Sequence, residues 1–192
     1  MQKKEIETFY AATKADWRKW LLDNHQVKQS VWLIQYKKKT GMPTVSWSEA
    51  VEEALCFGWI DSIKKTLDEE RLIQCFSKRK PKGTWSKINK DKILLLIENG
   101  HMAKAGLDAI EAAKLNGSWT MIDEVETLLI PADLQSALAN KPEAETFFLS
   151  LSKSSRKAIL QWLVFAKRAE TRQKRIEEIA TLAAQKLKPK GF

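Results

Sequence analysis

The stretch from residue 30 to residue 58, a strand pattern followed by a capped helix pattern, constrains the fold more than any other feature of the sequence. Residues 30–36 alternate between two sides, which is typical of a strand: Trp32, Ile34 and Tyr36 on one side and Val31, Leu33 and Gln35 on the other. The run Ser-Trp-Ser-Glu at 46–49 fits a capping box, in which a serine hydroxyl and a glutamate carboxylate satisfy the first backbone donors of a helix. Gly58 is placed to end that helix. A strand followed by a helix is therefore expected here.

Two more strand patterns follow this helix. Residues 59–67 and 71–77 flank Asp-Glu-Glu at 68–70, which predicts an antiparallel hairpin. The resulting order, β-α-β-β, predicts the α+β class. We expect a small, mostly antiparallel sheet of three strands packed with helices.

Helical spacing dominates the rest of the chain. Thr13 is the expected N-cap of a first helix, and Thr84 is the expected N-cap of one that ends at residues 99–100. Another helix is expected at about 103–115, and two longer ones at about 155–166 and 170–187. The apolar positions expected to face the core are Trp17, Trp20, Leu21, Trp47, Ala50, Val51, Ala54, Leu55, Ile88, Ile93, Leu96, Ile97, Leu107, Ile110, Ala113, Ile159, Trp162, Leu163, Ile176, Ile179 and Ala183.

The chain has no strand pattern from about residue 121 onward. The sequence therefore predicts an α+β domain over residues 1–120 and a helical C-terminal region over 121–192. Two cysteines, Cys56 and Cys75, form no CxxC pair and argue against a disulfide scaffold. The N-terminus lacks the apolar run of a signal peptide, and no segment has the roughly 20 apolar residues of a membrane span. A cytoplasmic location is expected.

The net charge of +9 is concentrated at two places, residues 78–92 and the C-terminal end. Such segments can attract nucleic acid, an anionic ligand or an acidic lipid surface, although a solvated surface that maintains solubility is the simpler interpretation. At the C-terminal end, Lys167, Arg168, Arg172 and Arg175 form a basic patch that can bind phosphate. The alternative is that these side chains only form pairs along a helix.

Signatures of enzymes are mostly absent from the sequence. It contains no GxGxxG, no GxxxxGK[ST] and no HExxH motif, and its two histidines are far apart. We therefore expect no cofactor and no metal site. Cys56 as a nucleophile, with His101 as its base, is the remaining enzymatic hypothesis.

Asp61 follows Trp59 and Ile60 in an apolar strand, where a lone carboxylate is costly to bury. It therefore needs a donor, which Arg71 on the next strand or Arg79 in the following loop can supply. One interpretation is an ion pair that fixes the hairpin to the loop. The other is a pocket wall for a small ligand, formed with Arg79 and Trp85.

The loop at residues 78–86 joins the hairpin to a helix start, where backbone N–H groups and the helix dipole favour an anion. It supplies several cations and the aromatic ring of Trp85, which is expected to offer a flat apolar wall; a basic surface turn is the alternative. The residues that we expect to bind a ligand are Trp59, Asp61, Arg71, Arg79, Lys80, Thr84, Trp85 and Ser86.

Three separate segments resemble the bacteriocin-protection, YdeI or OmpD-associated family: residues 53–61, the loop end Thr84-Trp85-Ser86, and residues 166–176. The resemblance extends over nearly the whole chain, with the named domain at about residues 131–188. It implies an association with tolerance of bacteriocins or antimicrobial peptides and with an outer-membrane partner. It implies no reaction and no catalytic residues.

Three functions of different classes follow. The favoured one is a non-enzymatic, cytoplasmic stress or protection protein that binds a small anionic ligand or a protein partner through residues 76–90. The second is weak, sequence-independent nucleic-acid binding, with Trp32, Tyr36 or Phe76 exposed on the sheet for stacking. The third is an enzyme of unrecognised type centred on Asp61 and Cys56. The oligomeric state stays open.

Overall fold

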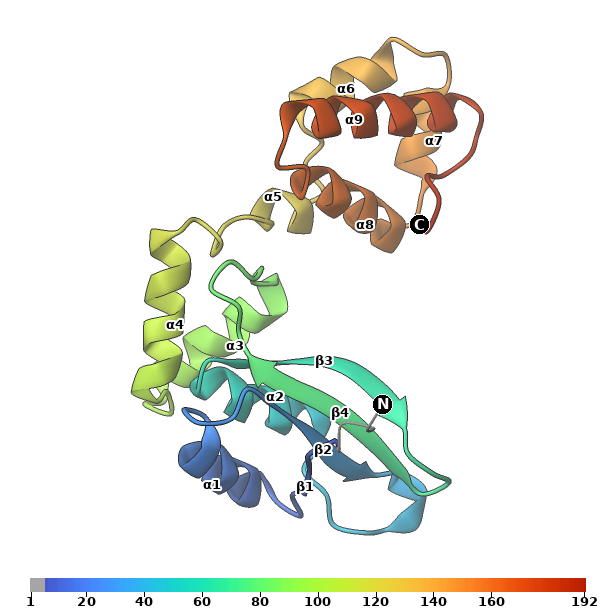
Figure 1. Cartoon of the computed structure of the whole chain (residues 1–192). Coiled ribbons are helices and arrows are strands. Elements are labelled where there is room, and N and C mark those ends of the chain that lie inside the picture. The colour runs from blue at the N-terminus through green and yellow to red at the C-terminus, as the bar shows by residue number, and fades with distance from the viewer. Residues whose placement is uncertain (1–5) are drawn as a thin grey trace, which may run out of the picture. The chain divides into compact units, whose positions relative to one another are not determined.

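The computed structural model describes residues 6–192 and confirms the α+β class (Figure 1). The chain divides into two compact units, which are described separately. The first comprises the chain up to Gly83 together with Ile88–Trp119, and the second comprises Thr84–Lys87 together with Thr120–Phe192. No helix among the described residues has both the length and the apolar character needed to cross a membrane.

The first unit contains a four-stranded sheet in the order β1-β2-β4-β3. The strands are β1 (Thr8–Tyr10), β2 (Ser30–Tyr36), β3 (Trp59–Thr66) and β4 (Arg71–Lys78). The hairpin of β3 and β4 and the antiparallel pairing of β2 with β4 agree with the expected pattern. The expectation of three strands was wrong, because β1 adds a parallel edge strand. Its three residues are too few to show an alternating pattern.

Helices α1 (Lys14–Asn24) and α2 (Trp47–Cys56) begin where the sequence predicts. Both have the complete capping box, Thr13 with Asp16 and Ser46 with Glu49. The short 3-10 helix η1 (Lys38–Thr40) lies between β2 and α2. Helices α3 (Lys87–Glu98) and α4 (Lys104–Leu115) follow the sheet. Since α3 begins at Lys87, Thr84 is not the residue directly before it, and the expected cap at Thr84 was wrong.

One face of the sheet is packed against α1 and α2. Trp17 of α1 lies 5.2 Å from the Phe76 ring, centroid to centroid, and its Nε1 donates to the Ala50 carbonyl of α2 at 3.0 Å. Val31 and Leu33 face the same side, since Val31 is the register partner of Phe76. Phe76 is completely buried there, so the expectation that its ring is available for stacking was wrong.

The opposite face of the sheet carries Trp32, Ile34 and Tyr36, all of them half-buried. Register places Ile73 and Cys75 on the same face, opposite Ile34 and Trp32. Helices α1 and α2 pack on the other face, and on this one Ile73 is buried, whereas Trp32, Ile34 and Tyr36 keep part of their surface exposed. We call it the open face of the sheet.

Some apolar side chains that were expected in the core are exposed. They are Trp47, Ile88, Ile97 and Leu107. In α3 the buried residues are Ile93 and Leu96. Ile88 precedes Ile93 by five positions, which turns it about 140° around the helix and away from the packed side.

From Thr120 onward the described residues form helices joined by loops and no strand, as the sequence predicts. The helices of the second unit are α5 (Asp123–Glu126), α6 (Ala132–Ala139), α7 (Ala144–Ser150), α8 (Lys153–Val164) and α9 (Ala169–Ala184). The core residues predicted for α8 and α9 are confirmed, since Ile159 and Leu163 pack with Ile176, Ile179 and Ala183. Leu134, Leu138 and Phe148 complete this core from α6 and α7.

Candidate functional site

Asp61 is half-buried on β3 and accepts two side-chain hydrogen bonds at Oδ2. The donors are Trp47 Nε1 at 3.0 Å and Gln74 Nε2 at 3.2 Å. Arg71 was one of the two expected donors, beside Arg79, but Arg71 is bound to Asp68, with Nη2 and Oδ2 2.6 Å apart. Asp68 also accepts the Arg71 backbone N–H, which makes this pair a local feature of the hairpin turn. The role of Trp47 and Gln74 was missed, because their meeting depends on the packing of α2 against the sheet.

A pocket of about 210 Å³ lies beside the start of the basic loop, and we call it the Arg79 pocket. It is lined by His25, Gln26, Phe57, Gly58, Trp59, Lys78, Arg79 and Ala105. Two of the expected ligand-binding residues, Trp59 and Arg79, therefore meet in one cavity. Lys78, the first cation of the expected binding loop, lies there with them.

The backbone around Gly58 shapes this pocket. Gly58 ends α2 with a φ of +72°, a conformation that side chains disfavour, and its carbonyl accepts the Arg79 N–H at 3.0 Å. A Cβ at Gly58 would lie 3.0 Å from the Ala105 carbonyl oxygen of α4. Glycine thus allows the end of α2, the start of α4 and the end of β4 to meet closely.

The residues that line the Arg79 pocket carry positive charge and no carboxylate. Burial lowers the pKa of Arg79 to about 10, against an opposing effect of Asp61. Burial thus disfavours the charged form of Arg79, which nevertheless stays protonated at neutral pH. Lys78 Nζ donates to the Gln26 carbonyl at 2.6 Å, which fixes a second cation at the rim.

His25 also lines the pocket in a defined orientation. Its Nδ1 lies 2.9 Å from the Leu21 carbonyl oxygen, and because a carbonyl only accepts, Nδ1 is the nitrogen that carries the proton in this contact. The ring packs against Phe57, with the centroids 5.1 Å apart. The remaining nitrogen, Nε2, is the one that can interact with a ligand.

The other residues expected at this site lie elsewhere. Lys80 is exposed and does not line the pocket. Thr84, Trp85 and Ser86 belong to the second unit. Trp85 was expected to offer an apolar wall, but it is only 2% exposed, so its ring is not a surface for a ligand.

The C-terminal basic patch is partly engaged in internal contacts. Arg172 forms a two-pronged pair with Asp133, with Nε–Oδ2 at 2.6 Å and Nη2–Oδ1 at 2.9 Å. Arg175 donates to the Trp162 carbonyl and lies over the Trp162 ring. Lys167 and Arg168 are exposed. Two of the four cations therefore stabilise the packing of the helices.

Cys56 is a poor nucleophile in this environment. Its side chain is completely buried, and burial followed by the charge of Glu53 raises its thiol pKa, against the opposing effect of Arg18. His101 is exposed, and its carbonyl accepts a hydrogen bond from Arg18 Nη2 at 2.9 Å. Among residues 6–192, no group of three His, Cys, Asp or Glu side chains could hold a metal ion.

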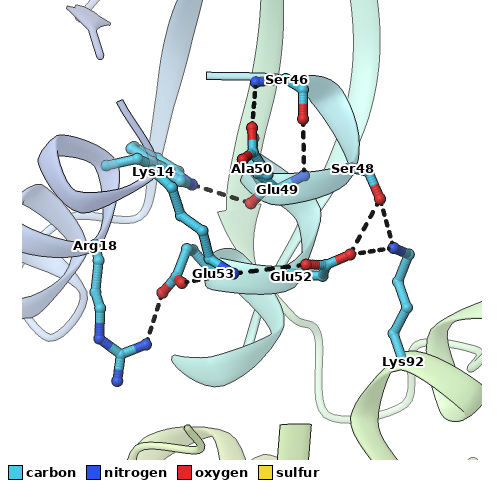
Figure 2. A network of polar contacts seen from close by, with 10 residues as sticks. Lys14, Arg18, Ser46, Ser48, Glu49, Ala50, Glu52, Glu53 and Lys92 are labelled. Atoms are coloured by element: carbon cyan, nitrogen blue, oxygen red, sulfur yellow. Dashed lines mark hydrogen bonds and ion pairs between the residues drawn. The ribbon is translucent and has the colours of Figure 1, made fainter. Parts of the chain in front are cut away.

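The carboxylates of α2 form a polar network with α1 and α3 (Figure 2). Glu53, which is 2% exposed, accepts from Arg18 with Nη1 and Oε2 2.6 Å apart. Glu52 pairs with Lys92 of α3 at 2.6 Å, and Lys14 lies within 3.6 Å of both glutamates. The buried Glu53 and the half-buried Glu52 are thus each matched by a cation, which is the arrangement of a structural network.

Comparisons with known proteins support a two-part chain. Residues 9–109, more than half of the chain, match the family model described as "Domain of unknown function (DUF8412)". Residues 127–186 match the model described as "Bacteriocin-protection, YdeI or OmpD-Associated". The resemblance seen in the sequence is thereby confirmed, and this match covers residues 127–186, only part of the chain. No curated protein and no solved structure matches the chain.

Proposed function

We propose that this chain, which belongs to the family described as Domain of unknown function (DUF8412), is a non-enzymatic protein that binds a small anionic ligand in the Arg79 pocket. One observation carries the proposal. The half-buried Arg79 has a lowered pKa and shares a cavity with Lys78, and no carboxylate lines that cavity. An anion bound there would lie beside two cations, Arg79 and Lys78, and could accept charge-assisted hydrogen bonds from both.

The geometry fits a compact anion better than an extended polymer. A volume of about 210 Å³ is below the usual range of drug-sized ligand pockets, roughly 300–1,000 Å³. Arg79 can contact a phosphate or carboxylate with two donors, whereas Lys78 acts as a point charge. Phe57 and Trp59 also line the cavity, but both side chains are buried, so the contacts open to a ligand are mainly polar. A phosphate-type or carboxylate ligand is therefore the expected class.

The proposal includes a role in stress or antimicrobial protection in the cytoplasm. Its support is the match of residues 127–186 to the bacteriocin-protection, YdeI or OmpD-associated model. We assign ligand recognition to the first unit, which contains the pocket. We assign to the second unit a contact with a protein partner.

Calorimetric titration of inorganic pyrophosphate into the full chain tests this function. Arg79→Gln and Lys78→Gln are the test variants, and Arg71→Gln and Lys80→Gln are the matched controls outside the pocket. We expect Arg79→Gln to weaken binding at least about tenfold, the effect of losing a hydrogen bond to a charged group. Both controls should bind like the wild type. Unchanged binding by folded Arg79→Gln and Lys78→Gln would refute the assignment.

Weak, sequence-independent nucleic-acid binding is the second candidate, and the open face of the sheet favours it. Trp32 and Tyr36 are half-buried there, and Lys65 Nζ lies 5.0 Å from the Trp32 ring centroid. Tyr10 packs edge-on against Tyr36, with ring centroids 5.4 Å apart. Aromatic rings flanked by cations can stack with bases and contact phosphates.

A further inference from the structure

A second and larger cavity, of about 470 Å³, opens where α2 begins, and we call it the Trp47 pocket. Leu72 and Gln35 face each other across β4 and β2 and form part of its lining. Trp47 adds an aromatic ring, and Lys38 and Lys64 add positive charge. All of these residues belong to the first unit, and none of them lines the Arg79 pocket.

Trp47 is held in place although it is exposed. Its side chain is 47% exposed, which is costly for a large apolar ring. The indole Nε1 donates to Asp61 Oδ2 at 3.0 Å, and Asp61 is fixed in turn by Gln74. The ring at the pocket therefore has a defined orientation before any ligand binds, which reduces the entropy lost on binding.

The charge of the pocket has a single sign. Three lysines line it and no carboxylate does. Lys37 Nζ is bound to the Asp68 and Glu69 carbonyls at 3.0 and 3.1 Å. Lys38 and Lys64 are exposed, and neither forms an ion pair within residues 6–192. Two ammonium groups are therefore available beside an apolar, aromatic lining.

We propose that the Trp47 pocket binds a flat aromatic ring that carries an anionic group, either a phosphate or a carboxylate. The ring packs against Trp47 and Leu72, and the anion lies at Lys38 and Lys64. The volume of about 470 Å³ falls within the range of small-molecule sites, and ring-to-ring packing contributes beyond the area that it buries. This site adds to the proposed function and does not depend on it.

The experiment follows the indole N–H signal of Trp47 by NMR in the full chain, assigned through Trp47→Phe. Adenosine monophosphate and 2-naphthoate are the two ring-bearing anions, and they distinguish a phosphate from a carboxylate. Two control compounds carry one part each: inorganic phosphate has only the anionic charge, and 2-naphthylmethanol has only the aromatic ring. Lys38→Glu and Lys64→Glu test the cations. Lys39→Glu is the matched control, because it lies in η1 beside Lys38 and does not line the pocket.

We expect at least one of the two ring-bearing anions to shift the Trp47 signal at lower concentration than inorganic phosphate or 2-naphthylmethanol does. Lys38→Glu and Lys64→Glu should each weaken that binding by about five- to tenfold, and Lys39→Glu by less than about twofold. The proposal is overturned if neither anion shifts the signal or if 2-naphthylmethanol binds equally well. It is also overturned if Lys39→Glu weakens binding as much as Lys38→Glu. Binding of pyrophosphate at the Arg79 pocket tests the proposed function and neither supports nor contradicts the Trp47 pocket.

Discussion

Asp61 acts through the two side chains that it orients. Its Oδ2 holds the exposed indole of Trp47 and the buried amide of Gln74, and Gln74 Nε2 also donates to the Ser62 carbonyl at 3.0 Å. Its negative charge also opposes the loss of protonation at Arg79. One carboxylate therefore influences both the Trp47 pocket and the Arg79 pocket without lining either.

We predict that Asp61→Ala lowers the free energy of unfolding by about 1–2 kcal/mol. Two hydrogen bonds are lost, but the exposed Trp47 indole can donate to water instead. Loss of a fully enclosed ion pair would cost about 3–5 kcal/mol. Urea denaturation measures the difference, and Asp61→Asn, which keeps an acceptor oxygen, should lose less than Asp61→Ala. A loss above about 3 kcal/mol would mean that Asp61 has a buried cationic partner after all.

Helix α2 is the element to which both pockets are attached, since Trp47 stands at its start and Gly58 follows its end. Its carboxylates connect it to α1 and α3 (Figure 2). Burial alone would raise the pKa of Glu52, but hydrogen bonds from Lys92 and Ser48 outweigh it and lower the pKa from its ordinary value of 4.5.

This lowered pKa predicts a pH dependence of stability. Because the folded pKa of Glu52 lies below its unfolded value, its contribution is present above about pH 4.5 and is lost as the pH falls through the folded pKa. The urea midpoint should fall more steeply between about pH 6 and pH 3 in the wild type than in Glu52→Gln. Glu98→Gln, at an exposed carboxylate, should keep the wild-type slope. Equal slopes for Glu52→Gln and the wild type would contradict the argument.

At the sheet, the open face predicts weak binding of single-stranded nucleic acid that decreases with salt. Trp32→Ala should weaken binding of a labelled oligo-dT by about tenfold, the loss of one stacked base. Phe165→Leu, at an exposed ring in the second unit, is the matched control and should have no effect. Binding that resists high salt or prefers particular bases would contradict this prediction.

The elements that the sequence predicted correctly are those set by local chemistry. The capping boxes at Thr13 and Ser46 each depend on a residue three positions away, and both are present. Gly58 is likewise a local signal. Strand β1 was missed because its only support is pairing with β2, 24 residues further along. The two pockets were missed as cavities because each joins segments that tertiary packing brings together.

At the scale of the whole molecule, the second unit has a core of its own. Its buried cluster comes from residues between Ile122 and Ala183, with Phe192 packed against it. The pair of Arg172 with Asp133 and the stacking of Arg175 on Trp162 lie within the same unit. A fragment should therefore retain these contacts.

We predict that residues 120–192, expressed alone, fold cooperatively. Circular dichroism should show a helical spectrum with a sigmoidal thermal transition, and NMR should show dispersed methyl signals. Ile159→Asp, which buries an unpaired charge in this core, is the control and should abolish the transition. A gradual, non-cooperative melt of the unmodified fragment would show that its core is insufficient.

The central claim, that an anion binds beside Arg79, is tested most directly by an amide NMR titration of the full chain with inorganic pyrophosphate. Binding at about millimolar affinity or tighter should produce the largest shifts at Gly58, Lys78, Arg79 and Ala105, and Arg79→Gln should remove them. The result that would contradict the claim is no saturable shift at these four amides, or shifts confined to the exposed Lys167 and Arg168.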